Sequence, residues 1–312
     1  MRKTLMATLA LATLASVPAW AADAYRFAIV PKAMNNPYFD LARNGCMAEA
    51  PKIGVSCTYT GPVEHEPATQ VQIVQDLISQ HIDGIAIAVA DAASVKRVIH
   101  QARQAGIPVI TFDADSPDSE RQAYVGTDNA ALGHALGQML MKVHPKPGQF
   151  ALVSGGPAAE NLTQRVQGVR DVLKAAGWTE VGGSPTFCND DSALAVQQMT
   201  DLATANPKLN AIVPVGGWPL FTQGAFNGFV NAHKAAMASG DFTIVSADTL
   251  PVELQEVQAG SVAGLVGQRP FEMGQKVMDV LLALKKGEKP PVITYAGLDE
   301  VTKANVAQFA KP

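Results

Sequence analysis

The stretch Pro31-Lys-Ala-Met-Asn-Asn-Pro-Tyr-Phe-Asp40 follows an apolar run, Phe27-Ala-Ile-Val30, and precedes a segment, Leu41 to Ala50, that can form a helix. The apolar run has the character of a buried strand. The order therefore predicts a turn from a strand into a helix, which is where open α/β sheets bind their ligands.

The residues of this turn are unusual for a simple connection. Asn35 and Asn36 can donate and accept hydrogen bonds, and asparagine tolerates the left-handed backbone of tight turns. Pro37 suits the first position of a helix. Tyr38 and Phe39 add two aromatic rings beside the amides. Amides and rings together suit a sugar, with its hydroxyls and its C–H faces, but a helix cap followed by two core aromatics explains the same residues.

The first 21 residues have the composition of a secretory signal peptide. Met1-Arg-Lys3 is basic, Leu5 to Val17 is apolar, and Ala19-Trp-Ala21 is a small-residue cleavage site. The apolar part is shorter than the roughly 20 residues that a membrane-spanning helix needs. We expect cleavage after Ala21 and an exported protein without a lipid anchor, because no cysteine follows that site.

Length and charge limit the classes of protein to which the remaining chain can belong. Residues 22–312 are long enough for two domains of about 100–200 residues each. Loss of Arg2 and Lys3 changes the formal charge from −4 to −6. This balance argues against a nucleic-acid surface and gives no sign of a basic membrane-binding patch.

The three cysteines predict one disulfide. Cys46 falls on the first expected helix and Cys57 on the second expected strand, which are neighbours in a βαβ unit, so we predict that they pair and that Cys188 is left over. No C-x-x-C or histidine pair indicates a metal site. The histidines are scattered and are expected at the surface; they are His65, His81, His100, His134, His144 and His233.

Strands and helices alternate along the chain, which predicts parallel sheets with right-handed crossovers. Gly84-Ile-Ala-Ile-Ala-Val89 is apolar throughout, as expected for a strand covered on both faces. The series restarts after Gly126-Thr-Asp128, the natural break between two similar halves. In the first half we expect strands at 55–60, 84–89 and 108–111, with helices at 67–80 and 94–105. In the second we expect helices at 129–143, 161–176, 192–205 and 271–286, with strands at 150–153, 181–187, 210–213, 243–245 and 262–266.

The predicted strands end in short polar or glycine-rich loops. The carboxyl ends of parallel strands share one edge of a sheet, so two lobes that face each other by these edges would form a cleft for a small polar ligand. Candidates for that cleft are Asp113 and Asp248 after strands, Gln268 at a crossing between lobes, Arg165 near a helix N-terminus, Trp218 within Gly216-Gly-Trp-Pro219, and Lys32 after the first strand.

Each candidate also has a purely structural explanation. The aspartates can cap turns, Gln268 can belong to a hinge, and Trp218 can pack in a core or an interface. Arg165 and Lys32 can be solvated surface cations, although a cation is unfavourable near the positive pole of a helix. Three enzyme or cofactor motifs are absent from the sequence: G-x-G-x-x-G after the first strand, a Walker motif and a G-x-S-x-G elbow.

The sequence resembles the periplasmic sugar-binding proteins of ABC importers, in the ribose- and galactose-type branch that shares its fold with LacI-type effector domains. The resemblance covers essentially all of residues 22–312. The motifs that carry it are Ile29 to Phe39, Gln75-Asp-Leu-Ile-Ser-Gln-His-Ile-Asp-Gly-Ile85, Ala105-Gly-Ile-Pro-Val-Ile-Thr-Phe-Asp113, Tyr124-Val-Gly-Thr-Asp-Asn129, Arg165-Val-Gln-Gly168, Ser246-Ala-Asp248 and Gln268.

This resemblance implies a periplasmic binding protein of type I, in which two Rossmann-like doubly wound lobes are joined by a three-segment hinge. The lobes would be 22–126 plus 269–296 and 127–268 plus 297–312. It also implies a periplasmic monomer that binds a monosaccharide or polyol without a cofactor or catalysis, and that delivers it to a membrane permease. The implied ligand contacts are Asn36, Tyr38, Phe39, Asp113, Arg165, Asp248 and Gln268.

The sequence departs from the ribose-type pattern at three places. Ala114 replaces the usual arginine, Asp190 an aromatic residue, and Gly216-Gly217 an Asn-Asp pair. We expect Lys32 to replace the missing cation, Trp218 the missing ring, and Asp190 to face the ligand. Pro31-Lys32 also resembles the autoinducer-2-binding branch. Two alternatives therefore remain, a signal receptor for autoinducer-2 or chemotaxis, and a secreted carbohydrate enzyme.

Overall fold

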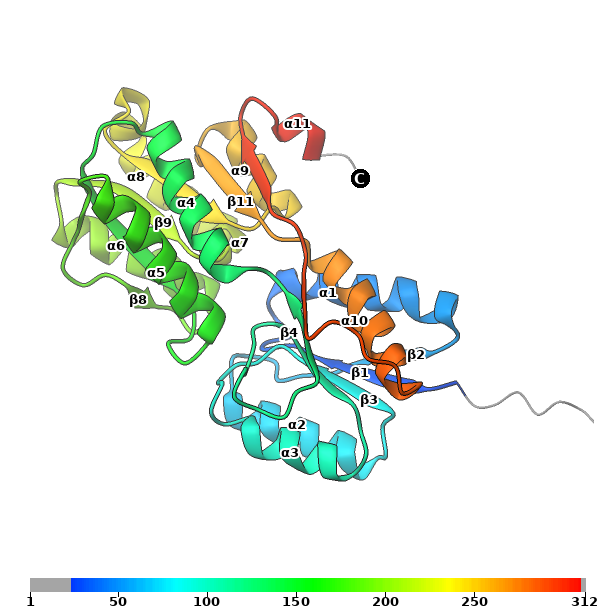
Figure 1. Ribbon diagram of the computed structural model, residues 1–312. Coiled ribbons are helices and arrows are strands. Elements are labelled where there is room, and N and C mark those ends of the chain that lie inside the picture. The colour runs from blue at the N-terminus through cyan, green and yellow to red at the C-terminus, as the bar shows by residue number, and fades with distance from the viewer. Residues whose placement is uncertain (1–23, 310–312) are drawn as a thin grey trace, which may run out of the picture.

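A computed structural model describes residues 24–309 and shows two α/β lobes, each built on one sheet (Figure 1). The predicted signal peptide, residues 1–21, lies outside the described residues. Within the described part of the chain, no helix combines the length and the apolar character needed to cross a membrane.

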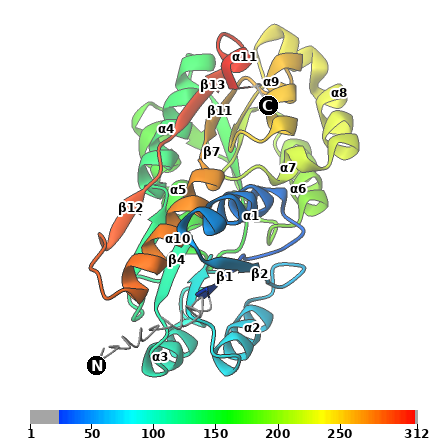
Figure 2. The same cartoon turned by 90° about the vertical axis from the view of Figure 1, so that its right-hand side faces the viewer.

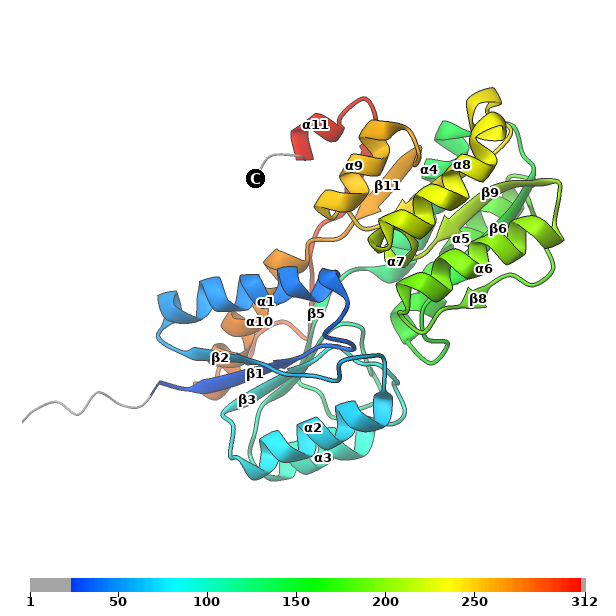
Figure 3. The ribbon, with the colours of Figure 1, turned by 180° about the vertical axis from the view of Figure 1, so that it is seen from behind.

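The N-terminal lobe contains a six-stranded sheet in the order β12-β5-β4-β3-β1-β2, with every pair parallel. Helices α1 and α10 pack on one face of the sheet, and α2 and α3 on the other (Figure 3). The strands are β1 (Arg26–Val30), β2 (Ser56–Tyr59), β3 (Gly84–Ile87), β4 (Val109–Asp113), β5 (Ala123–Gly126) and β12 (Ile293–Tyr295). The helices are α1 (Pro37–Glu49), the short 3-10 helix η1 (Ala50–Ile53), α2 (Pro67–Ser79), α3 (Lys96–Gln104) and α10 (Pro270–Lys285).

The C-terminal lobe contains a sheet in the order β13-β11-β10-β9-β6-β7, and β8 also pairs with β6. Only β13 runs antiparallel to its neighbour in the described chain, which departs from the predicted all-parallel sheet. The strands are β6 (Gln149–Ser154), β7 (Thr179–Glu180), β8 (Thr186–Phe187), β9 (Leu209–Pro214), β10 (Thr243–Ala247), β11 (Gly264–Gly267) and β13 (Asp299–Thr302). The helices are α4 (Asn129–Val143), α5 (Glu160–Ala175), α6 (Ser192–Ala205), α7 (Trp218–Phe221), α8 (Gln223–Ser239), α9 (Pro251–Ala259) and α11 (Val306–Phe309).

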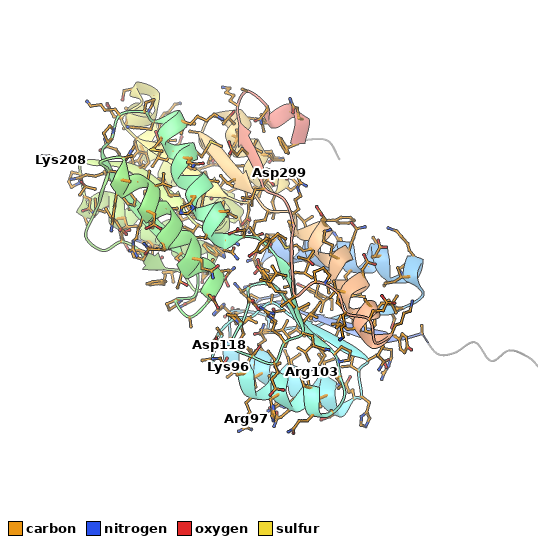
Figure 4. All side chains as sticks on the ribbon, in the orientation of Figure 1. Lys96, Arg97, Arg103, Asp118, Lys208 and Asp299 are labelled. Carbon is orange, nitrogen blue, oxygen red and sulfur yellow. A yellow bond between two sulfur atoms is a disulfide. The ribbon has the colours of Figure 1, made fainter. Side chains whose placement is uncertain are left out.

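The chain passes between the two sheets three times, after Gly126, Gly267 and Tyr295 (Figure 2). Two of the crossing segments are joined by an ion pair. Asp299, labelled in Figure 4, accepts hydrogen bonds from Arg269 Nε at 3.1 Å and Nη2 at 2.8 Å. Three crossings that run side by side form a connection about which two lobes can rotate.

The predicted strand at 181–187 is wrong. The structure has two separate two-residue strands, β7 and β8, on either side of a turn. Gly183 has a φ of 86°, which is not strand geometry, and Pro185 has no N–H to donate to a neighbouring strand. The helices α8 and α9, and the short helices α7 and α11, were not predicted from the sequence.

The structure contains a disulfide between Cys46 of α1 and Cys57 of β2, whose Cα atoms are 6.3 Å apart. These are the two cysteines that the βαβ arrangement predicted to pair. Cys188 is free and buried, and burial raises the pKa of its thiol above the usual range. The disulfide ties the first helix to the edge strand of the N-terminal lobe.

Candidate ligand site between the lobes

A cavity lies between the lobes, at the carboxyl ends of the strands. Both lobes contribute side chains to it, and most of these are polar and buried. All ten candidate residues line this cavity: Lys32, Asn36, Tyr38, Phe39, Asp113, Arg165, Asp190, Trp218, Asp248 and Gln268. The residues selected from the sequence thus come together from seven different segments of the chain.

The loop between β1 and α1 forms part of the N-terminal wall. Asn36 is the N-cap of α1, and its Oδ1 accepts a hydrogen bond from Tyr38 N at 3.0 Å. The rings of Tyr38 and Phe39 pack edge to face, with their centroids 5.2 Å apart. Phe39 packs in the same way on Phe112, with a centroid distance of 6.2 Å. The explanation of this loop as a helix cap followed by core aromatics therefore holds, and the same residues also line the cavity.

The three cavity aspartates share an unusual backbone conformation. Asp113, Asp190 and Asp248 have φ angles of 59°, 62° and 73°, in the left-handed region that most residues avoid. Asp113 ends β4 and Asp248 follows β10 directly, so the chain turns sharply at both strand ends. Backbone in this region costs of order 1–3 kcal/mol per residue and is concentrated at functional sites.

The Asp113 carboxylate lies between two cations. Lys32 Nζ is 3.5 Å from one oxygen, and Arg165 Nη2 is 4.0 Å from the other. Both distances are longer than a hydrogen bond, so each oxygen keeps the capacity to accept one from a ligand. Burial and the nearby Asp113 charge raise the pKa of Tyr38 well above its usual value, which keeps the Tyr38 hydroxyl protonated.

Arg165 is held by residues of the crossing segments. Its Nε donates to Asn129 Oδ1 at 2.8 Å, and its Nη2 donates to Gln268 Oε1 at 2.7 Å. Gln268 in turn donates from Nε2 to Asp248 Oδ1 at 2.7 Å. Two of the three segments that lead from one sheet to the other therefore orient both a cation and a carboxylate of the cavity.

Burial raises the pKa of Asp248, although the charge of Arg165 and the hydrogen bond from Gln268 oppose this shift. Its other oxygen, Oδ2, accepts a hydrogen bond from Gly217 N at 3.1 Å. Asp248 is thus bound on both oxygens by the protein, in contrast to Asp113. Each oxygen of Asp248 has a further lone pair that can accept a hydrogen bond from a ligand.

Trp218 lies against a wall of glycines. A Cβ atom on Gly216 would come within 2.5 Å of the indole ring, and one on Gly155 within 2.9 Å. A Cβ on Gly217 would collide with the buried carboxyl group of Glu253. The Gly216-Gly217 pair therefore allows the indole and the α9 carboxyl group to pack closely against this loop.

Two hydrogen bonds join the lobes across the cavity. Lys32 Nζ donates to Asn161 Oδ1 at 3.1 Å, and His65 Nδ1 lies 2.9 Å from Asp190 Oδ2. Burial alone would raise the pKa of Asp190, but the hydrogen bond with His65 and the charge of Lys32 hold it below its usual value.

The surface prediction for the histidines is wrong at two positions. His65 has a side chain that is 8% exposed because it reaches the other lobe, and His144 is buried with Nδ1 2.9 Å from Thr243 Oγ1. The sequence around His65 and His144 gives no sign of either contact, because Asp190 and Thr243 lie far away along the chain.

Three further side chains line the cavity that were not predicted from the sequence: Asn161, Leu162 and Phe221. A signal existed for two of them. Asn161 lies four residues before Arg165 on α5, and Phe221 three residues after Trp218 on α7, so each shares a helix face with a predicted residue.

The site is suited to binding a polar molecule by hydrogen bonds and ring contacts. Lys32 uses one of its three donors, and Arg165 uses three of its five. Within residues 24–309, no group of three or more His, Cys, Asp or Glu side chains is arranged to hold a metal ion.

Residues 27–289 match the family model of the periplasmic binding protein domain. The chain belongs to this family. The predicted family and the predicted two-lobed α/β fold class are therefore confirmed.

Similar proteins cover nearly the whole chain. The ribose import binding protein RbsB of Salmonella typhimurium is 27% identical over 92% of this chain and 93% of its own. The D-allose-binding periplasmic protein of Escherichia coli is 25% identical over 88% of each chain. A solute-binding protein of an ABC transporter from Burkholderia graminis, crystallised with D-arabinose, superposes with a TM-score of 0.84 at 32% identity, over 92% of this chain and 98% of that one.

Proposed function

We propose that the protein captures one monosaccharide or polyol in the cavity between its lobes and delivers it to the membrane permease of an ABC importer. The observation that carries the proposal is the Asp113 carboxylate, buried between Lys32 and Arg165, whose two oxygens keep lone pairs that can accept hydrogen bonds. Neighbouring hydroxyls of a sugar are donors that suit two such oxygens.

The charge of the cavity favours a neutral ligand. Asp113, Asp190 and Asp248 would repel an anion, whereas Lys32 and Arg165 would repel a cation. A neutral polyhydroxyl compound can donate to the carboxylates and accept from the cations. Tyr38, Phe39 and Trp218 provide ring faces for its C–H groups.

These charged groups and rings can account for micromolar binding of a sugar. Hydrogen bonds to charged groups contribute roughly 1.5–3 kcal/mol each, and a micromolar binder needs about −8 kcal/mol. A few such bonds together with ring contacts reach this value after the cost of ordering the ligand. The relatives named above are binding proteins for ribose, allose and arabinose, which supports a sugar of this size.

We further propose that the lobes 22–126 plus 269–296 and 127–268 plus 297–312 rotate as two bodies about the three crossings. The described form is closed, because buried side chains from both lobes are in contact. An open form would admit the ligand, and the closed form would be presented to the permease. The proposed setting is the periplasm, with the protein acting as a monomer.

Thermal denaturation with a panel of compounds tests this proposal. The panel contains D-ribose, D-allose, D-arabinose, D-xylose, D-fucose, a polyol and autoinducer-2. A sugar present at 100 times its Kd should stabilise the fold by about 2.7 kcal/mol, seen as a rise in Tm. A rise with autoinducer-2 alone would favour the signal receptor, and chemical conversion of a bound sugar would favour an enzyme.

A further inference from the structure

The contact between His65 and Asp190 joins two loops that belong to different lobes. His65 lies between β2 and α2 of the N-terminal lobe, and Asp190 lies just before α6 of the C-terminal lobe. The side chains are 8% and 4% exposed, and the atoms Nδ1 and Oδ2 are 2.9 Å apart. His65 does not line the cavity, so its role is separate from direct ligand contact.

Both sides of this contact are held in place. Met34 N and Asn35 N donate to the carbonyl oxygens of Pro62 and Val63, which ties the His65 loop to the loop that carries Asn36. On the other lobe, the imidazole packs against Gly156, where a Cβ atom would come within 2.8 Å of Nε2. The absence of a side chain at Gly156 leaves room for the ring beside Asp190.

We propose that His65 and Asp190 form a latch that stabilises the closed form and slows the departure of the bound ligand. The slower departure of the ligand rests on the proposed function, whereas the stabilisation of the closed form does not. His65 is a positioning residue in this scheme, because it acts through Asp190 and the lobe contact.

The physical reason is that the contact exists only while the lobes are together. When the lobes separate, both groups return to water. When His65 is removed from the closed form, Asp190 stays buried without its hydrogen-bond partner, and leaving a buried charge without its partner is strongly destabilising. The loss of His65 therefore shifts the equilibrium toward the open form.

The charged groups around the latch are few. Asp190 is influenced by Lys32 from the β1–α1 loop as well as by His65, and Trp218 of α7 is a hydrogen-bonding neighbour. Glu64 and Glu66 flank His65 in its own exposed loop, and Asp191 follows Asp190 as the N-cap of α6. The latch thus joins one imidazole to one carboxylate, and Lys32 is the nearest further charge that affects that carboxylate.

A backbone contact between the lobes provides a reporter. Ala92 N, in the loop before α3, donates to Ala158 O in the loop before α5 at 3.4 Å. This amide exchanges its hydrogen when the lobes part. Amide hydrogen exchange at Ala92 therefore measures opening in the protein without ligand, and no sugar needs to be known.

The test compares wild type with His65→Ala, His65→Gln and His100→Ala. His100 forms a similar contact, at 2.6 Å with Glu120, but both residues belong to the N-terminal lobe. The latch predicts exchange at Ala92 at least about tenfold faster in His65→Ala, partial recovery in His65→Gln, which retains a donor, and no change in His100→Ala.

If the amide hydrogen of Ala92 exchanges at the same rate in wild type and in His65→Ala, whether fast or slow, the latch is ruled out. Near-ultraviolet circular dichroism confirms that each variant is folded. If a sugar of the panel binds, its dissociation should also be at least about tenfold faster from His65→Ala. If no sugar binds, the exchange result still decides the latch, and the failure counts against the proposed function alone.

Discussion

At the scale of single residues, the site depends on aspartates in a conformation that most side chains avoid. Asp113, Asp190 and Asp248 reach the left-handed region at strand ends or in loops, and all three line the cavity. Asp113 and Asp248 could be selected from the sequence because a polar residue directly after a buried strand is conspicuous, whereas Asp190 was selected as a departure from the ribose-type pattern. The backbone angles of the three could not be predicted, because they depend on the packing of both lobes.

Asp113→Asn should weaken sugar binding by roughly ten- to a hundredfold, because a neutral amide presents one acceptor where the carboxylate presents two. Isothermal titration calorimetry with the sugar that gives the largest thermal shift measures the change. Asp118→Asn is the control. Asp118 pairs with Lys96 at 3.3 Å on the outer surface of the N-terminal lobe (Figure 4), and its loss should leave the affinity unchanged. Equal affinity of Asp113→Asn and wild type would remove Asp113 from the site.

The pH dependence of sugar binding should depend on the ionisation of the Asp190 carboxyl group. Its pKa in the closed form lies below the usual value, so its contribution is present at neutral pH and is lost as the pH falls through the lowered pKa. Asp248, whose pKa burial raises, loses its charge first as the pH falls in both wild type and His65→Ala, so Asp190 accounts for the part of the acid loss that differs between them. In His65→Ala the main cause of the lowered pKa is gone, so the acid loss should begin at higher pH. Titrations from pH 3 to 8 that superimpose for the two proteins would contradict this account.

At the scale of secondary structure, the sequence predicted elements with a strong apolar pattern and missed those without one. The bounds of α4 and α6 agree with the predicted 129–143 and 192–205. In α8, by contrast, only Phe226 and Phe229 are buried, so a helical period is barely visible. In α9, two of the four buried residues are glutamates, which a search for apolar faces rejects.

One of these glutamates gives a prediction for stability. Burial raises the pKa of Glu253 well above its usual value, so the folded protein holds a proton that the unfolded chain releases above about pH 4.5. Stability should therefore fall as the pH rises beyond that value. Glu253→Gln needs no such proton and still accepts the hydrogen bond from Leu250 N.

Urea denaturation should show Glu253→Gln gaining stability relative to wild type as the pH rises from 5 to 8. The exposed Glu288→Gln serves as the control and should show no such trend. A difference between Glu253→Gln and wild type that does not change with pH would show that Glu253 is ionised in the folded protein.

The disulfide gives a second prediction at this scale. Cys46 and Cys57 are 11 residues apart, and closing a loop of about this length stabilises a fold by roughly 2–3 kcal/mol. Reduction should lower the free energy of unfolding by this amount, measured in urea with and without dithiothreitol. Alkylation of all three cysteines in the unreduced, unfolded protein would show that the bond does not form.

At the scale of the whole molecule, the sequence predicted which residues would line the cleft but not which would meet across it. Asp113 and Asp248 follow from the rule that strand ends share one edge of a sheet. The contacts of Lys32 with Asn161 and of His65 with Asp190 depend on how one lobe is placed on the other. No periodicity within one segment contains that information, so the latch could be found only in the structure.

A crystal structure of the protein grown with the sugar of largest thermal shift decides whether the cavity between the lobes is the ligand site. We expect an unaltered sugar between the lobes, with hydroxyl oxygens within about 3.2 Å of the Asp113 carboxylate and a ring face against Trp218. A sugar bound outside this cavity, or one bound between the lobes without contact to Asp113, would contradict this expectation.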